Sequence, residues 1–126
     1  MGTTRLRAVL DFTADKRDGY LRIDVTGQYQ SGAFSQLGDL VAQQSEQHRC
    51  NRVLLDLRAL QGSIPGMDRF AAGVYASQVW KTNLRAAIVL RREEIDRFFA
   101  NTAVNRGVQT LVVATLEEAK SWLGVS

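Results

Sequence analysis

Two segments near the start of the chain alternate apolar and polar residues with a period of two. Apolar side chains take every second position from Leu6 to Phe12 and again from Leu21 to Val25. This spacing predicts two β-strands that each bury one face. The polar stretch between them ends in Asp18-Gly19, which suits a tight hairpin turn. We therefore predict that the chain opens with an antiparallel strand pair.

From Ser31 the apolar period lengthens to that of a helix. Phe34, Leu37 and Val41 share one helical face, and Ser31 precedes them in a position suited to an N-cap. The pattern predicts a helix that starts near Ser31 and ends near His48.

Three later segments are almost continuously apolar: residues 52–57, 86–90 and 108–114. Runs of this kind indicate strands that are covered on both faces, as in a parallel sheet. A helical pattern follows each of them. The first places apolar residues three and four apart at Met67, Phe70, Ala71, Val74 and Tyr75.

The second helical pattern covers residues 95–103 and stops near Gly107, and the third starts with a capping box formed by Thr115 and Glu118. We predict an α/β fold with a mixed, mostly parallel five-stranded sheet, about four helices and an N-terminal antiparallel hairpin.

Composition limits the architecture to one domain. With 126 residues, 45% of them hydrophobic, we expect a single domain over residues 1–126. Cys50 is the one cysteine, which excludes a disulfide framework. No apolar run approaches the roughly 20 residues that cross a bilayer. The start of the chain also lacks the apolar stretch of a secretory signal, so we expect a cytoplasmic protein.

The net charge of +3 is small, and the arginines are scattered among acidic residues. A nucleic-acid-binding protein concentrates positive charge on one face. We therefore predict no nucleic-acid partner.

Metal and cofactor chemistry lack the necessary residues. His48 and Cys50 are the single histidine and the single cysteine, and a zinc site normally needs three or four such ligands. We interpret them as a helix-end cation and a packed thiol, with a Cys-His nucleophile pair as the alternative. No phosphate-binding glycine loop or nucleophile elbow occurs. We predict no enzyme activity, no cofactor and no metal.

A basic, glycine-containing segment, residues 58–66, follows the predicted parallel strand at residues 52–57 and leads into a helix. Ligands of open α/β sheets bind at such strand ends. Arginines after neighbouring strands share this edge with helix N-termini that attract anions. The candidates for binding an acidic partner or an anion are Arg58, Ser63, Gly66, Arg69, Arg91 and Arg92. The alternative is that Asp68, Glu93 and Glu94 neutralise these arginines in solvent.

Ser63 is also a candidate phospho-acceptor, because it lies in an exposed type of loop between Gly62 and Pro65. A phosphate there would add nearly two negative charges beside a helix start. The alternative is a simple turn or cap residue.

One helix face carries enough apolar surface to suggest a ligand. A gap between the sheet and the helix predicted from Met67 to Tyr75 would admit a lipid or another apolar molecule. The candidates for that contact are Phe70, Val74, Tyr75 and Trp80. The alternative is that these side chains form ordinary core.

The order of elements resembles the SpoIIAA-like branch of the STAS superfamily, over roughly residues 20–123. The segments that carry the resemblance are Arg52-Val-Leu-Leu-Asp-Leu57, Asp68-Arg-Phe70, Leu84-Arg-Ala-Ala-Ile-Val-Leu90, Ala103-Val-Asn-Arg-Gly107 and Glu118-Ala-Lys-Ser-Trp-Leu123. The resemblance implies a bacterial, noncatalytic domain that docks onto a protein partner and regulates it. In this branch it also implies an association with lipids or a membrane surface.

The sequence departs from the family's pattern at the start of the helix after the third predicted strand. Family members that antagonise anti-sigma factors carry a motif there that resembles Asp-Ser-Ser-Gly or Asp-Ser-Thr-Gly, whereas this chain has Gly62-Ser-Ile-Pro-Gly66. Binding through the same surface is therefore expected, and phosphorylation-controlled switching is not. We predict a protein-interaction domain, with a small lipid or apolar-ligand binding protein as the alternative. A homodimer is also expected, with no surface assigned to it.

Overall fold

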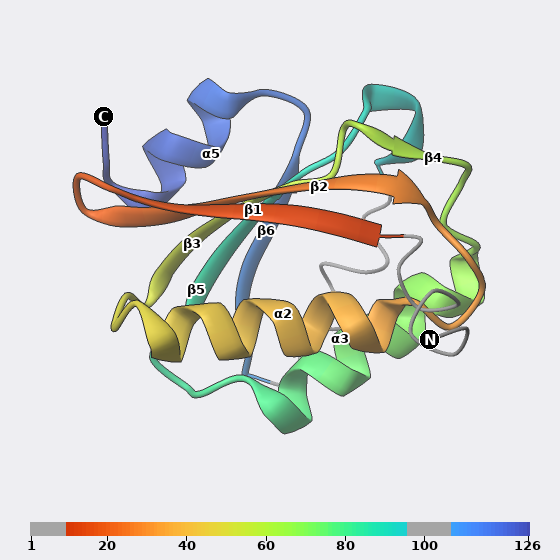
Figure 1. Ribbon diagram of the computed structural model, residues 1–126, viewed down its shortest axis with the longest axis horizontal. Helices are drawn as coiled ribbons and strands as arrows, with labels where there is room; N and C mark the ends of the chain where they lie inside the picture. The colour runs from red at the N-terminus through yellow and green to blue at the C-terminus, as the bar shows by residue number, and fades with distance from the viewer. Residues whose placement is uncertain (1–9, 96–106) are drawn as a thin grey trace.

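The computed structural model describes residues 10–95 and 107–126. A central sheet has helices α2 and α3 on one face and helix α5 on the other (Figure 1). The strands are β1 (Leu10–Arg17), β2 (Tyr20–Gln28), β3 (Arg52–Asp56), β4 (Leu60–Gln61), β5 (Arg85–Val89) and β6 (Gln109–Val113). The helices are α2 (Phe34–Gln47), α3 (Gly66–Val79), the 3-10 helix η1 (Arg92–Glu94) and α5 (Leu116–Leu123).

The strand order confirms the predicted mixed, mostly parallel sheet. Strands follow one another as β1-β2-β3-β5-β6, with β4 paired to β2. Among the described strands, only β1 and β2 pair antiparallel, and their hairpin closes at Arg17 and Tyr20. Within residues 10–95 and 107–126 the sheet has six strands, one more than predicted. The additional strand β4 is two residues long, which is too short to show a period in the sequence.

Parts of two predicted elements lie outside the described residues. These are the start of the first strand, from Leu6, and most of the predicted helix at residues 95–103. Just before the predicted helix the structure has the 3-10 helix η1, and Ile95, the first residue of the predicted helix, is in an extended conformation. Within the two described ranges, no helix combines the length and the hydropathy needed to cross a bilayer.

The apolar runs bury both faces of the sheet, as predicted. In β3, Val53 and Leu55 pack with the α2 side chains, whereas Leu54 packs under α5. The alternating strand β2 buries Leu21 and Ile23 beneath α2. On the opposite face of β2, Tyr20 packs in the α5 cluster, whereas Arg22 and Asp24 further along the strand are partly exposed.

The predicted caps have different outcomes. The Thr115 hydroxyl accepts the backbone N–H of Glu118, which confirms the start of α5. The Ser31 cap is wrong, because α2 begins at Phe34 with Ala33 as its N-cap. The preceding turn is held instead by Asp68 of α3, whose carboxylate accepts the backbone N–H of Gly32 at 2.9 Å. Such a distant contact leaves no local sequence signal.

Candidate functional site

Three loops meet where the parallel strands end. They are residues 29–33 after β2, residues 58–65 after β3, and residues 91–94 after β5. Figure 1 shows β4, η1 and the start of α3 at the same end of the molecule. We call these three segments the loop rim. The carboxyl ends of parallel strands share one edge of a sheet, so the predicted meeting of these segments follows from the topology.

Arg91 holds the middle loop of the rim. Its guanidinium donates to the carbonyl oxygens of Leu60, Gly62 and Arg58, the last two at 3.1 and 3.3 Å. Its Nε lies 3.3 Å from a carboxylate oxygen of Glu93. Arg91 therefore shapes the rim from within, and its charge is partly used inside the protein.

Glu94 joins the middle loop to η1. This buried carboxylate accepts the Ser63 hydroxyl at 2.8 Å, the Ile64 backbone N–H at 3.4 Å and Arg69 Nη2 at 2.7 Å. Burial by itself raises the pKa of the Glu94 carboxyl. The hydrogen bonds from Ser63 and Ile64, with the charges of Arg69 and Arg91, outweigh burial and leave that pKa below its usual value.

Asp68 joins α3 to the first loop of the rim. Its buried carboxylate accepts the Tyr29 hydroxyl at 2.7 Å as well as the Gly32 N–H. Burial, and then the hydrogen bond and negative charge of Asp68, raise the pKa of the Tyr29 hydroxyl. The hydroxyl therefore remains a donor at neutral pH. Two acidic residues, one at each side of the middle loop, thus fix the shape of the rim.

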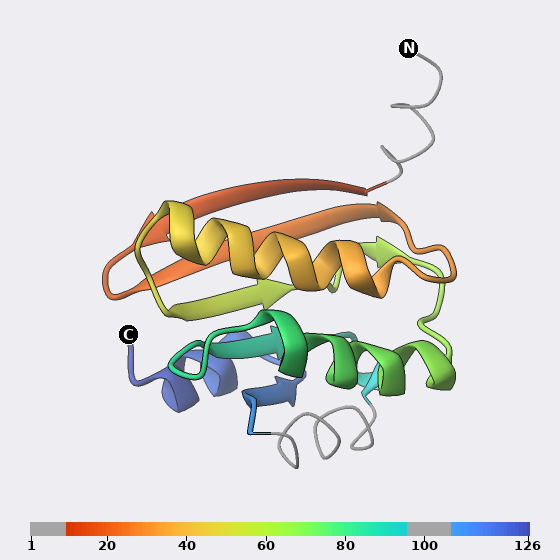
Figure 2. The ribbon, with the colours of Figure 1, turned by 90° about the horizontal axis from the view of Figure 1, so that it is seen from below.

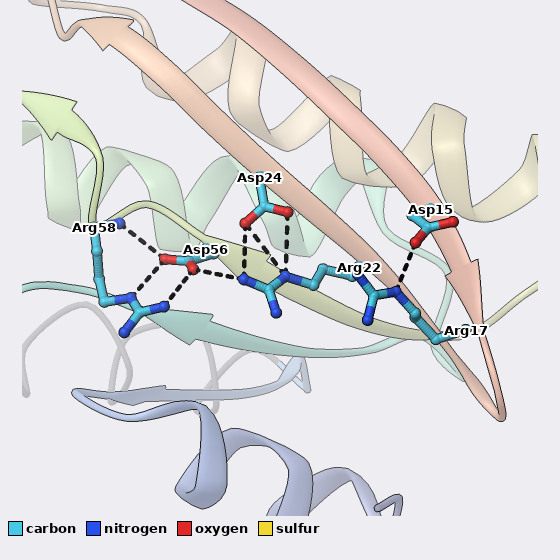
Figure 3. A network of polar contacts seen from close by, with 6 residues as sticks. All are labelled: Asp15, Arg17, Arg22, Asp24, Asp56 and Arg58. Carbon is cyan, nitrogen blue, oxygen red and sulfur yellow. Dashed lines mark hydrogen bonds and ion pairs between the residues drawn. The ribbon is translucent and has the colours of Figure 1, made fainter.

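Arg58 faces away from the α2 and α3 helices, toward the sheet face that α5 leaves open. It pairs with Asp56 through Nη2 at 2.7 Å, and Arg22 reaches the same carboxylate at 3.3 Å (Figure 3). Burial raises the pKa of the Asp56 carboxyl, but the hydrogen bonds from Arg58 and the charges of Arg58 and Arg22 hold it below its usual value. Arg58 is therefore part of a row of ion-paired side chains that runs across the sheet through Asp56 and Arg22.

The structure brings the predicted site residues to one end of the sheet, but several of the predicted anion-binding arginines are paired with acidic residues of the chain itself. The neutralising alternative holds for Arg69, which pairs with Glu94, and for Arg91 beside Glu93. Ser63 is exposed although its hydroxyl is donated to Glu94, and Gly66 is the exposed first residue of α3. Arg92 is exposed, and its side chain shows no hydrogen bond or ion pair with the part of the chain that the structure describes.

Apolar surface at the start of α3 is a feature that sequence reasoning missed. Met67 is 80% exposed and Phe70 is 38% exposed. The sequence pattern placed both in the apolar period of a predicted helix and did not show that Met67 would be exposed. The buried residues of α3 include Asp68, Gly73 and Ala76. An aspartate and a glycine do not stand out as buried positions in an apolar pattern, so the sequence did not identify this buried face of α3.

An apolar cavity of about 70 Å³ lies between α2, α3 and the sheet. Trp80 lines it together with Leu37, Ala76 and Ile88, whereas Phe70, Val74 and Tyr75 do not. Ligand pockets usually have about 300–1,000 Å³. The cavity in this conformation is therefore too small for an acyl chain.

The residues weighed for metal or nucleophile chemistry lie apart from the rim. His48 is the C-cap of α2, and Cys50 is buried just before β3, with its thiol donating to the Arg52 carbonyl at 3.4 Å. Among residues 10–95 and 107–126, no three His, Cys, Asp or Glu side chains group closely enough to hold a metal.

Comparison with solved structures identifies the fold. No family model and no curated protein matches the chain. An anti-sigma factor antagonist from Mycobacterium paratuberculosis superimposes with a TM-score of 0.62 and 13% identity, over 91% of this chain and 94% of that one. An uncharacterized DUF3478 protein with a SpoIIAA-like fold from Shewanella loihica aligns over 90% and 93%, with 18% identity and a TM-score of 0.47. The chain therefore shares the fold of the anti-sigma factor antagonist, in agreement with the SpoIIAA-like fold expected from the sequence.

Proposed function

We propose that the chain is a noncatalytic regulatory domain that binds a protein partner through the loop rim and the first turn of α3. The apolar surface that Met67, 80% exposed, and Phe70, 38% exposed, form together at the start of α3 carries the proposal, because neighbouring exposed apolar side chains mark interaction sites and a single one does not. The anti-sigma factor antagonist with the same fold supports a regulatory role by analogy of fold.

The rim favours a partner that combines an apolar pocket with acidic groups. Met67 and Phe70 present apolar surface at the start of α3, and Arg92 presents a positive charge on η1. The internal contacts of Arg91, Glu94 and Asp68 hold the backbone beneath them in place. A surface fixed before binding loses less conformational entropy when a partner docks. The proposal includes a cytoplasmic location, which fractionation of host cells tests.

Affinity capture from the native host tests this proposal. The wild-type chain is compared with a Met67→Glu, Arg92→Glu double variant and with Lys81→Glu, a charge reversal at an exposed position after α3. We expect one defined protein to be retained by wild type and Lys81→Glu and lost from the double variant. Equal retention by all three would overturn the rim as the binding surface, and retention of nothing by wild type would overturn the partner role.

Ser63 remains a proposed phospho-acceptor within this surface. A phosphate on its hydroxyl would replace the hydrogen bond to Glu94 with repulsion between anions. Ser63→Glu should therefore speed exchange of the Ile64 amide hydrogen by about tenfold or more, and Ser63→Ala should have a smaller effect. Phosphopeptide mass spectrometry of the protein from its host then shows whether the modification occurs. If Ser63 is always found unmodified, its role as a phospho-acceptor is overturned.

The apolar-ligand alternative has weaker support. The cavity of about 70 Å³ would have to grow about fourfold to reach the lower end of the usual range of ligand pockets. Native mass spectrometry distinguishes the two functions. A fatty-acyl adduct that survives purification would favour the carrier, and a protein that always emerges empty would favour the interaction domain.

A further inference from the structure

Strand β1 forms an open edge of the sheet. It pairs with β2 along all eight of its residues, Leu10 to Arg17. Figure 2 shows it as the outermost strand, and no other described segment pairs with its outer side. An edge strand of this length presents backbone N–H and C=O groups that another strand can use. The edge is therefore a ready surface for β-strand addition.

The hairpin decides which backbone groups face outward. Only Asp18 and Gly19 separate Arg17 from Tyr20, so this closing pair is hydrogen-bonded. Hydrogen-bonded and non-bonded pairs alternate along an antiparallel ladder. Every second residue counted back from Arg17 therefore directs its backbone N–H and C=O toward β2. The residues between them direct these groups outward; they include Phe12, Ala14 and Lys16.

Charge complementarity selects a second copy of β1 as the occupant. In an antiparallel pair centred on Ala14, Asp11 lies opposite the partner's Arg17, and the same contact repeats on the other side of the twofold axis. Thr13 then lies opposite the partner's Asp15. Opposite charges facing each other across a strand pair are stabilising, and like charges are destabilising.

Neighbouring registers lack this complementarity. Centring on Thr13 sets Asp11 opposite the partner's Asp15, and centring on Asp15 sets that residue opposite itself. Moving the twofold axis by one residue shifts the register by two residues, so the side chains keep their faces and only their partners change. The register centred on Ala14 is therefore favoured over its neighbours.

The exposed side chains of β1 fit this arrangement. Asp15 and Arg17 pair with each other at 2.6 Å and are 63% and 46% exposed, so both remain accessible to a second copy. They lie on the sheet face that also carries Arg22 and Asp24 (Figure 3). On the other face, Phe12 is 47% exposed beside a groove of about 190 Å³ between β1 and α2. The aliphatic stem of the partner's Lys16 would cover its ring.

We propose that two copies of the chain pair antiparallel through β1, in the register centred on Ala14, to form one continuous sheet. This gives the homodimer expected from the sequence a specific surface. The inference rests on the β1 edge alone and does not depend on the function of the loop rim.

Cysteine cross-linking tests the register. In a Cys50→Ala background, Ala14→Cys places two thiols across the axis, where Cα atoms of a hydrogen-bonded pair are about 5.5 Å apart and within disulfide range. Lys16→Cys is the control. It lies on the same face of the same strand, but its two copies would be about 14 Å apart, four residues along the strand and one strand spacing across. We expect an oxidised dimer from Ala14→Cys and none from Lys16→Cys, and equal cross-linking of both, or of neither, would overturn the register.

A charge swap tests the contact itself by analytical ultracentrifugation. Asp11→Arg and Arg17→Asp should each weaken the dimer by about tenfold, because two symmetric attractions become repulsions. The double variant restores opposite charges at both positions and should regain the wild-type association. A wild-type protein that stays monomeric as its concentration rises, or a double variant no better than the single ones, would overturn the proposal.

Discussion

At the scale of single residues, the Glu94 carboxylate determines whether the loop before α3 keeps its shape. It accepts Ser63, Ile64 and Arg69 at once while being 8% exposed. Removal of its charge would leave the partly buried guanidinium of Arg69 beside a neutral amide. The stability of the chain should therefore depend on the ionisation of this one group.

We predict that Glu94→Gln lowers the free energy of unfolding by about 1–3 kcal/mol at neutral pH. The folded-state pKa of Glu94 lies below its unfolded value. Its contribution is thus fully present above the unfolded pKa of about 4.3 and is lost as the pH falls through the folded pKa. Urea unfolding at a series of pH values should show the difference between wild type and variant shrinking in acid.

Glu93→Gln is the matched control, because the Glu93 side chain is 71% exposed. Its effect on unfolding should be within about 0.5 kcal/mol at every pH. A pH-independent loss in Glu94→Gln, or an equal loss in Glu93→Gln, would show that the ionised carboxylate does not fix the loop.

Arg49 occupies a backbone conformation that usually belongs to glycine. Its φ is 51°, just after the end of α2, and it donates its N–H to the Glu46 carbonyl at 3.2 Å. Cys50 donates to the Ser45 carbonyl, which completes a Schellman-type helix end. A side chain in this left-handed region is strained.

We predict that Arg49→Gly stabilises the chain by about 0.5–1 kcal/mol, because the strain removed exceeds the added freedom of the unfolded chain. Thermal unfolding measures the change. His48→Gly is the control, since His48 has φ −93° and gains nothing from glycine. Destabilisation by Arg49→Gly would mean that the guanidinium makes contacts worth more than the strain.

At the scale of elements, α2 and α3 pack closely because Gly38 has no side chain. A Cβ at this position would lie 2.9 Å from the Tyr75 ring. Tyr75 is itself held by its hydroxyl, which donates to Asp39 at 2.7 Å, and by an edge-to-face contact with Phe34. The ring therefore has little freedom to move away.

Gly38→Ala should destabilise the chain by about 1–3 kcal/mol through overpacking between the two helices. Gly66→Ala is the control, because a Cβ there meets nothing within 4 Å. It should be neutral or stabilising by up to about 1 kcal/mol. Denaturant unfolding of both variants measures the difference, and equal effects would show that helix propensity, and not packing, decides the cost at Gly38.

The sequence predicts elements well where a period extends over several turns or strand residues. The alternation in β2 and the apolar runs in β3 and β5 follow from burial on one face or on both. The N-cap of α2 and strand β4 were missed, because distant residues stabilise them. Asp68 holds the turn before α2 from 36 residues away.

The same limit applies to the candidate site. Topology brings Arg58, Ser63 and Arg91 to one end, and that could be predicted from strand order. The roles of Arg91 and Glu94 could not, because their contacts with the middle loop span roughly 30 residues of sequence. The exposure of Met67 was hidden by an apolar pattern that does not distinguish a buried stripe from a binding surface.

At the scale of the whole molecule, two candidate surfaces occupy different parts of the fold. Figure 2 shows β1 at the top edge and the first turn of α3 at the lower right, with α2 between them. Helix α2 rests on Leu37 and Val41, which belong to the main core. No described hydrogen bond or ion pair links the side chains of β1 to the loop rim.

Because sites without shared contacts behave independently, we predict that each surface can be removed without loss of the other. Met67→Glu should leave the concentration dependence of sedimentation unchanged, and Arg17→Asp should leave retention of the host protein unchanged. Sedimentation and affinity capture are measured on both single variants and on their combination. If Arg17→Asp also abolishes capture, the partner recognises the dimer and not one chain, and the two surfaces would have to be treated as one assembled site.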